Sequence, residues 1–179
     1  MSVLMESAGG ISQISTILPS YTCYALSLPM AESETYVEAY KAYLDSKQAL
    51  PSYNKQQKDL QKRDALSPSE FVRRVGVKEV AFATFGNQSS PSKVNLVKMG
   101  RQDTIIFRGT GVKAFKEYTP EVHKFAFPGH IAAVFGEYFL LQDESCFTYV
   151  DGWLITGSRK AVEEFQSGRA GEYTLSQYM

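Results

Sequence analysis

Residues 146–156 read CFTYVDGWLIT and carry the strongest strand and turn signals of the chain. Two runs of apolar, aromatic and β-branched residues, the composition typical of strands, flank an Asp-Gly pair. Asp-Gly is among the strongest short-range signals for a two-residue hairpin turn, because both residue types tolerate a positive φ. The stretch therefore predicts an antiparallel hairpin with strands at 146–150 and 153–156.

A helix is predicted directly after this hairpin. Ser158 is a favourable capping residue, and Ala161, Val162 and Phe165 then recur at the spacing of one buried helix face. Gly168 predicts the end of the helix, because glycine readily adopts the left-handed conformation found there.

Further strands are predicted upstream, at 21–28, 77–85, 93–99 and 104–108. The segment 77–85 is apolar on both faces for most of its length, which favours a central position in the sheet. A tight turn is expected at 100–103, and residues 131–135 suit either a strand or a short helix. From residue 77 onwards the pattern is that of an antiparallel meander.

Between the first two strands, residues 32–75 change to helical periodicity. Ser33 is expected to cap a first helix, and a second, polar and largely exposed helix is expected after Leu50. A third begins at Ser67, where Ser-Pro-Ser-Glu places a cap, a proline at the first helical position and a glutamate at the third. Gly76 is expected to end this third helix.

This order predicts an α+β fold, in which a curved antiparallel sheet carries helices on one face and a helical insertion at 32–75 follows the first strand. The chain has 179 residues, 44% hydrophobic and 21% charged, which suits a single domain spanning 1–179. Thr174, followed three residues later by Gln177, matches a capping box close to Met179, the last residue printed. We therefore expect an excerpt of a longer protein, or a domain that docks against a downstream segment.

The charges of the chain balance. Nineteen basic and nineteen acidic residues leave a formal net charge of zero, so no net field attracts nucleic acid or an anionic membrane surface. The local basic run 55–63 is expected to form a solvated helix face. The sequence contains no apolar run long enough to span a bilayer, so we expect no membrane insertion of this segment.

Residues with catalytic or metal-binding chemistry are present without a recognisable pattern. Cys23 and Cys146 lie in apolar runs and are expected to be small buried side chains, able to form a disulfide only if their strands are adjacent. His130 and Cys146 could form a weak Cys/His hydrolase, but no oxyanion loop accompanies them, and a surface or hinge histidine is the simpler interpretation. Asp143 and Glu144 suit a solvated bend. We expect no catalytic residue, no cofactor and no metal site.

Aromatic residues are numerous: eleven Tyr, eleven Phe and one Trp. Most fall at core periodicities, yet exposed aromatic side chains bind sugars and peptides, so a small-molecule or glycan-binding domain is an alternative function. The candidate ligand or partner contacts are Trp153, Tyr149 and Tyr138. For Trp153, one residue after the hairpin turn, a core or interface role is the simpler interpretation.

The run 147–158, followed by Ala161 to Phe165, resembles a strand-turn-strand-helix module of uncharacterised bacterial envelope proteins, in which Gly-Trp, a Leu and Gly-Ser recur. Residues 133–139, 18–44 and 77–80 are also similar to that group. The resemblance implies a fragment of an exported or lipid-anchored protein, located in the periplasm or at the cell surface. It implies a structural or binding role and no known reaction.

Together, the balanced charge, the missing catalytic pattern and this resemblance favour a non-enzymatic module that contacts other domains of the same protein or another protein. The glycan-binding and hydrolase interpretations remain as alternatives. Exposed aromatic residues around a pocket would favour the first of these, and a reactive Cys146 thiol would favour the second.

Overall fold

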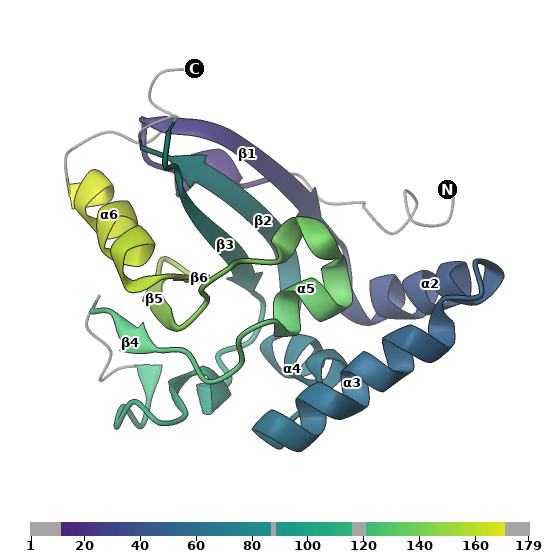
Figure 1. Cartoon of the computed structure of the whole chain (residues 1–179). Helices are drawn as coiled ribbons and strands as arrows, with labels where there is room; N and C mark the ends of the chain where they lie inside the picture. The colour runs from purple at the N-terminus through teal and green to yellow at the C-terminus, as the bar shows by residue number, and fades with distance from the viewer. Residues whose placement is uncertain (1–11, 87–88, 116–120, 171–179) are drawn as a thin grey trace.

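The computed structural model describes residues 12–86, 89–115 and 121–170 (Figure 1). Within these ranges the strands form one six-stranded antiparallel sheet in the order β1-β2-β3-β6-β5-β4. The strands are β1 (Thr22–Pro29), β2 (Val77–Phe85), β3 (Ser92–Met99), β4 (His123–Lys124), β5 (Cys146–Val150) and β6 (Trp153–Gly157).

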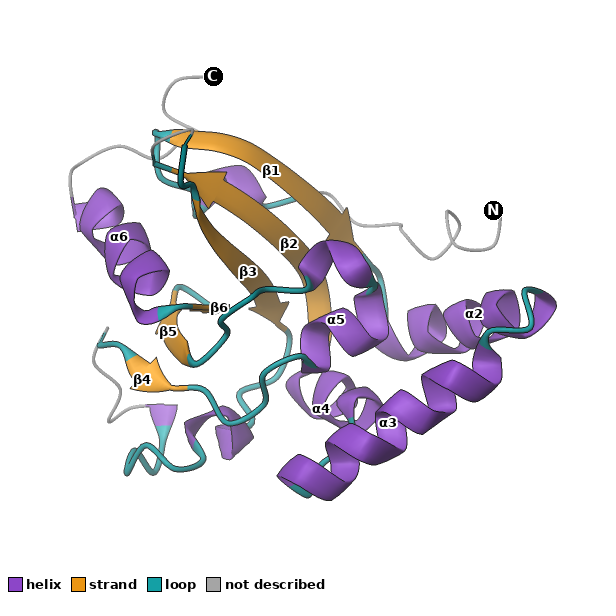
Figure 2. Cartoon of the chain, viewed as in Figure 1, coloured by secondary structure: helices purple, strands orange, loops and turns teal. Residues whose placement is uncertain are grey.

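Helices fill most of the remaining described chain (Figure 2). The α-helices are α2 (Ser33–Ser46), α3 (Leu50–Asp64), α4 (Pro68–Val75), α5 (His130–Phe135) and α6 (Arg159–Ala170). The short 3-10 helices are η1 (Ile14–Thr16), η2 (Thr104–Phe107) and η4 (Glu137–Phe139). The predicted α+β class is confirmed, with an open antiparallel sheet and the predicted helical insertion between its first two strands.

The hairpin forms as predicted. Tyr149 pairs with Leu154, and the turn residues Asp151 and Gly152 have φ values of 49° and 83°. Two consecutive positive φ values match the twist of the flanking strands, which explains why Asp-Gly stands here. The strand β6 then pairs with β3 and joins the hairpin to the rest of the sheet.

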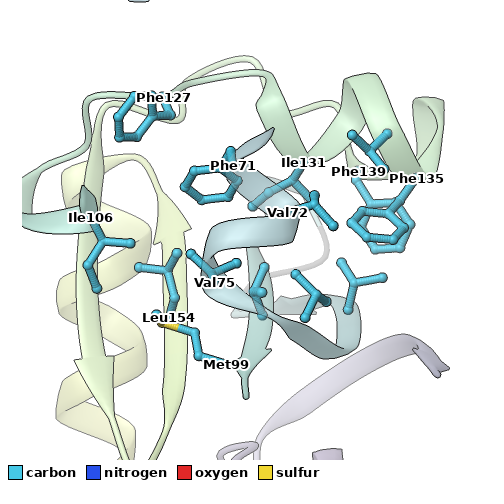
Figure 3. Close-up of a cluster of buried hydrophobic side chains, with 14 of the residues drawn as sticks. Phe71, Val72, Val75, Met99, Ile106, Phe127, Ile131, Phe135, Phe139 and Leu154 are labelled. Atoms are coloured by element: carbon cyan, nitrogen blue, oxygen red, sulfur yellow. The ribbon is translucent and has the colours of Figure 1, made fainter. Parts of the chain in front are cut away.

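The capping signals of α4 are also confirmed. Ser67 accepts a hydrogen bond from the backbone N–H of Glu70 at 3.2 Å, and Gly76 ends the helix with a φ of +58°. Phe71, Val72 and Val75 are almost completely buried. Figure 3 shows these three side chains turned into a shared core with Ile131 of α5 and Leu154 of β6.

Two clusters of buried side chains cover the two faces of the sheet. The larger cluster joins side chains of α2, α4 and α5 to Val80, Val97 and Leu154. The smaller cluster joins α6 and the segment around η1 to Phe85 and Leu96, whose side chains point to the other face. The prediction placed all helices on one face, whereas α6 packs on the opposite one, because strands such as β2 carry apolar side chains in both directions.

Residues 104–108, predicted as a strand, contain the 3-10 helix η2 instead. Asp103 accepts a hydrogen bond from the backbone N–H of Ile105 at 2.9 Å and is held by Arg74 through two bonds of 2.7 and 2.9 Å. Ile106 and Phe107 are thereby turned into the core. This tertiary anchoring outweighs the β-propensity of the run.

Helix ends were predicted less well. Gly168 does not end α6, which continues to Ala170; a Cβ at Gly168 would clash with the Tyr21 ring, so close packing explains this glycine. Ser33 is the first residue of α2 rather than its cap, and Glu32 precedes it. Residues 131–135 adopt the helical alternative within α5. The helix start predicted at Thr174 lies outside the described residues.

The two cysteines differ in exposure. Cys146 is buried as predicted, whereas Cys23 is exposed, because it lies at a register shift of the edge strand β1. Both are free, and β1 and β5 are not neighbours in the sheet, so the condition for a disulfide is not met. Among the described helices, none has both the length and the hydropathy needed to cross a membrane.

Candidate functional site

The three aromatic candidates of the sequence analysis are not brought together. Trp153 is only 1% exposed and packs in the cluster beneath α6, with Lys98 Nζ 5.5 Å from its ring centre. Tyr149 is half-buried on the other face of the sheet, where its ring contacts Phe115. Tyr138, in η4, is 77% exposed. Trp153 was predicted as a ligand or partner contact, and this is corrected: it has a core role, which was the simpler interpretation given for it.

The two residues of the hydrolase alternative are engaged separately. His130 is completely buried, so it is not the surface or hinge residue expected, and its ring packs against Phe71 and Phe127. The Cys146 sulfur lies 3.8 Å from the Ser145 hydroxyl oxygen. Within the described residues, no hydrogen bond joins His130 to Cys146, and a Cys/His nucleophile requires one.

A groove of about 910 Å³ lies between α3 and α5. We call it the α3–α5 groove. Its first wall is formed by Ala49, Ser52, Gln56, Asp59, Leu60 and Arg63, and its second wall by Gly129, Ala132, Ala133, Gly136, Glu137 and Leu140. In Figure 1, α5 lies near the middle of the molecule, and α3 lies on the side away from α6.

The first wall follows one face of α3 from end to end. Positions 49, 52, 56, 60 and 63 recur every three or four residues, which is the spacing of a single helix face, and Asp59 lies beside Leu60. From Ala49 to Arg63 this face is about 21 Å long at a rise of 1.5 Å per residue. The groove is therefore elongated along a helix axis.

The second wall consists largely of small residues. Gly129, Ala132, Ala133 and Gly136 present little more than backbone to the groove. Gly129 and Gly136 begin and end α5 with φ values of +82° and +104°, where a side chain would be strained. Beyond them, Leu140 is 65% exposed at the edge of the groove. Such a wall allows another backbone to approach closely.

Tyrosines close one end of the groove. Tyr40 stacks on Tyr36 and Tyr43 at ring separations of 6.0 and 6.3 Å, and Tyr53 of α3 meets it edge-on at 6.0 Å. Burial raises the pKa of Tyr40, and the neighbouring Tyr53 adds to this; burial raises the pKa of Tyr36 to about 12. The Tyr40 phenol therefore stays neutral and offers the groove a hydroxyl group and an apolar ring face.

Gln57 fixes the distance between the two walls. Its Nε2 donates to the carbonyl oxygen of Ala133 at 3.1 Å, and its Oε1 accepts from the backbone N–H and hydroxyl of Ser69, both at 3.0 Å. The side chain is almost fully buried. One amide thus joins α3, α4 and α5.

A buried carboxylate holds the start of α5. Glu144 Oε2 accepts from the backbone N–H of Gly129 at 2.7 Å, and Oε1 accepts from the Thr156 hydroxyl at 2.6 Å and from Asn95 Nδ2 at 3.1 Å. Burial raises the pKa of Glu144 despite these donors. The solvated bend predicted at Asp143 and Glu144 is corrected for Glu144, which is drawn inward by the sheet residues Asn95 and Thr156, whereas Asp143 is exposed as predicted.

His130 and Arg63 complete this support. His130 Nε2 lies 3.0 Å from the carbonyl oxygen of Leu66, and burial lowers the pKa of His130. Arg63 donates to the carbonyl oxygen of Pro128 at 2.5 Å and pairs with Asp64. The loop before α5 is therefore fixed from two sides, and the groove has a preformed base.

The sequence analysis did not predict this groove. Its walls are separated by some seventy positions in the chain, and their approach depends on the buried partners of Gln57 and Glu144 rather than on local pattern. The small-residue spacing at 129, 132, 133 and 136 was the available signal. The basic run 55–63 does lie on an exposed part of α3, with Lys55, Lys58 and Lys62 all exposed.

The chain was compared with known proteins in three ways. No protein-family model, no curated protein and no solved structure matches it. The resemblance to bacterial envelope proteins therefore stays a prediction, and so does the extracytoplasmic location that it implies.

Proposed function

We propose that this chain is a protein-interaction module and that its α3–α5 groove binds a helical segment of another domain or another protein. The observation that carries the proposal is the shape of the groove, which follows one face of α3 along its whole length opposite a wall of glycine and alanine. No catalytic role is part of the proposal.

The length of the groove favours a polypeptide over a small ligand. A face of about 21 Å matches roughly fourteen helical residues at 1.5 Å each. A monosaccharide or a metabolite would occupy a fraction of it. Recognition of an amphipathic helix in an apolar groove between helices is a common mode of peptide binding.

The side chains at the groove suit such a partner. Leu60 and the exposed Leu140 offer apolar contacts, and the small second wall lets the partner's apolar face lie close to α5. Lys55, Asp59 and Glu137 line the groove with both signs of charge. These charges select the orientation of the partner more than they add affinity.

A display selection tests the proposal. Random peptides of about fifteen residues, long enough for four helical turns, are selected against the whole chain. Binding is then compared with Ala132→Trp, which fills the groove at a partly exposed position, and with Ser167→Trp on the exposed side of α6 as the matched control.

We expect selected peptides to carry apolar residues at helical spacing, to bind the Ser167→Trp control and to lose binding to Ala132→Trp. Failure to enrich any peptide contradicts the proposal, and so does a set of peptides that binds both variants equally. Saturable binding of a glycan at Tyr40 and Tyr53 without peptide binding would favour the glycan alternative.

A further inference from the structure

The α3–α5 groove has two chemically distinct ends. Gln57 of α3 bonds to Ala133 of α5, and Arg63, near the end of α3, bonds to Pro128, just before α5. The two helices therefore run in opposite directions along the groove. One end of the groove lies at the last turn of α3 and the start of α5, and the other lies at the first turn of α3 and the end of α5.

Glu137 marks the end of the groove at the first turn of α3. It follows Gly136, which ends α5, and it lines the groove together with Tyr40. Burial is the main cause of the raised pKa of Tyr40, and the Glu137 carboxylate adds to it, which agrees with their proximity. Glu137 is exposed, and no ion pair within the described residues includes it. A basic side chain of a partner can therefore pair with it.

Arg63 marks the opposite end. With Lys62 it makes the last turn of α3 basic, and its side chain is half exposed although it pairs with Asp64. The Asp64 side chain is only 11% exposed, and its Oδ2 lies 3.6 Å from the buried His130 Nδ1. Asp64 is thus turned toward the interior, and the Arg63 guanidinium is the charged group that this end presents to a partner.

The charges along α3 do not by themselves distinguish the two directions in which a partner helix could lie. Lys55, Asp59 and Arg63 line the groove at intervals of one helical turn. Their order of positive, negative and positive charge is the same from either end. Glu137, on the second wall, breaks this symmetry, because it adds a negative charge at one end only.

A helix has a preferred charge pattern of its own. Acidic residues in the first turn and basic residues in the last turn stabilise a helix, because they oppose the partial charges at its ends. A segment that folds on binding must offset the entropy lost on ordering, so this intrinsic stability contributes to its affinity.

Such a helix matches the groove in one direction only. Its acidic first turn then lies at Arg63 and its basic last turn lies at Glu137, so it runs antiparallel to α3. This direction also places opposite ends of the partner and α3 side by side, which is favourable for the dipoles of these two helices. In the parallel direction the acidic turn would face Glu137, and like charges disfavour that arrangement.

We propose that the partner of the α3–α5 groove is a helix of about fourteen residues that has an acidic first turn and a basic last turn and binds antiparallel to α3. This inference rests on the function proposed above and adds the direction and the charge pattern of the partner. Apolar residues between the two charged turns lie against Leu60 and the small side chain of Ala132.

Spin labels on the helical peptide obtained by the display selection test the direction. The peptide is bound to the whole wild-type chain, with a nitroxide at its first residue in one sample and at its last residue in another. A nitroxide broadens the NMR signals of amide groups near it. We expect the label on the first residue to broaden Gly129 more than Ser52, and the label on the last residue to do the reverse. The opposite pattern, or equal broadening of both signals, overturns the proposal.

A charge reversal tests the pairing at Glu137. We expect Glu137→Lys to weaken binding of the same peptide about threefold at low salt, which is within the range of an exposed ion pair. Replacing the basic residues in the last turn of the peptide by glutamate should restore binding to this variant. Glu163→Lys makes the same change of charge at an exposed position of α6 and should leave the affinity unchanged. An affinity that is also unchanged in Glu137→Lys overturns the proposal.

These outcomes separate the inference from the proposed function. If no peptide is selected, or if selected peptides bind Ala132→Trp as tightly as the wild type, helix binding in the groove is contradicted and the inference is contradicted with it. If peptides bind in the groove but lie parallel to α3, or bind Glu137→Lys unchanged, only the direction and charge pattern of the partner are contradicted.

Discussion

Gln57 Nε2 donates to the carbonyl oxygen of Ala133 at 3.1 Å, across the 76 positions that separate these residues in the chain. This bond, together with the two that Gln57 Oε1 accepts from Ser69, ties the polar helix α3 to the core helices α4 and α5. Because α3 contributes few buried apolar side chains, such a polar contact has a large share in holding it.

Replacement of Gln57 tests this tie. Gln57→Ala leaves the Ala133 carbonyl and the Ser69 N–H without their partner, and each unsatisfied buried group costs about 1–3 kcal/mol. We expect the free energy of unfolding, measured with urea, to fall by about 2–4 kcal/mol. The control is Gln61→Ala, one turn later on the exposed side of α3, with a change below about 0.5 kcal/mol. If both variants lower the free energy of unfolding equally, the Gln57 amide does not hold α3 to α4 and α5.

His130 makes stability depend on pH on the acid side. Burial lowers its pKa below the ordinary value of 6.5, so the unfolded chain binds a proton at a pH where the folded chain does not. Its contribution is complete above pH 6.5 and is lost as the pH falls through the lowered pKa. The contribution of His130 to the free energy of unfolding, measured with urea, should therefore fall progressively below pH 6.5.

His130→Leu should flatten this slope, although its stability at neutral pH also falls because the bond to the Leu66 carbonyl is lost. His123→Leu replaces the other histidine of the chain and serves as the control. If the pH dependence of the unfolding free energy disappears in His123→Leu and persists in His130→Leu, its assignment to His130 is contradicted.

Glu144 acts in the opposite direction. Burial raises its pKa above the ordinary value of 4.5, so the folded chain holds a proton that the unfolded chain has released. Its contribution is complete below pH 4.5 and is lost as the pH rises through the raised pKa. Glu144→Gln should remove this loss, because the amide stays neutral while its oxygen still accepts from Thr156 and Asn95.

The neighbouring carboxylate supplies the control. Asp143 is exposed, and Asp143→Asn should keep the pH dependence of the wild type. The measurement is the difference in unfolding free energy between each variant and the wild type at a series of pH values above 4.5. A difference that stays constant with pH for Glu144→Gln would contradict the assignment.

The difference between local signals and long-range contacts explains which elements could be predicted from the sequence. The hairpin at Asp151-Gly152 and the cap at Ser67 were predicted, because their signals are local and each rests on backbone conformations that few residues adopt. The 3-10 helix η2 was missed, because its conformation follows from the contact of Asp103 with Arg74, distant in sequence.

The candidate site was less accessible to prediction for the same reason. Tyr138, predicted as a ligand or partner contact, is 77% exposed, whereas Trp153, predicted with it, fills the core. The α3–α5 groove depends on the burial of Gln57 and Glu144, two polar residues that a pattern of apolar periodicity treats as surface. Buried polar side chains with long-range partners are invisible to such a pattern.

The affinity of one selected helical peptide for three forms of the whole chain tests the central claim most directly. Fluorescence anisotropy would compare the wild type with Ala132→Trp in the groove and Ser167→Trp on α6. We predict an affinity at least about tenfold weaker for Ala132→Trp, which corresponds to about 1.4 kcal/mol, and an unchanged affinity for Ser167→Trp. Equal affinities for all three forms would contradict the claim that the α3–α5 groove is the binding site.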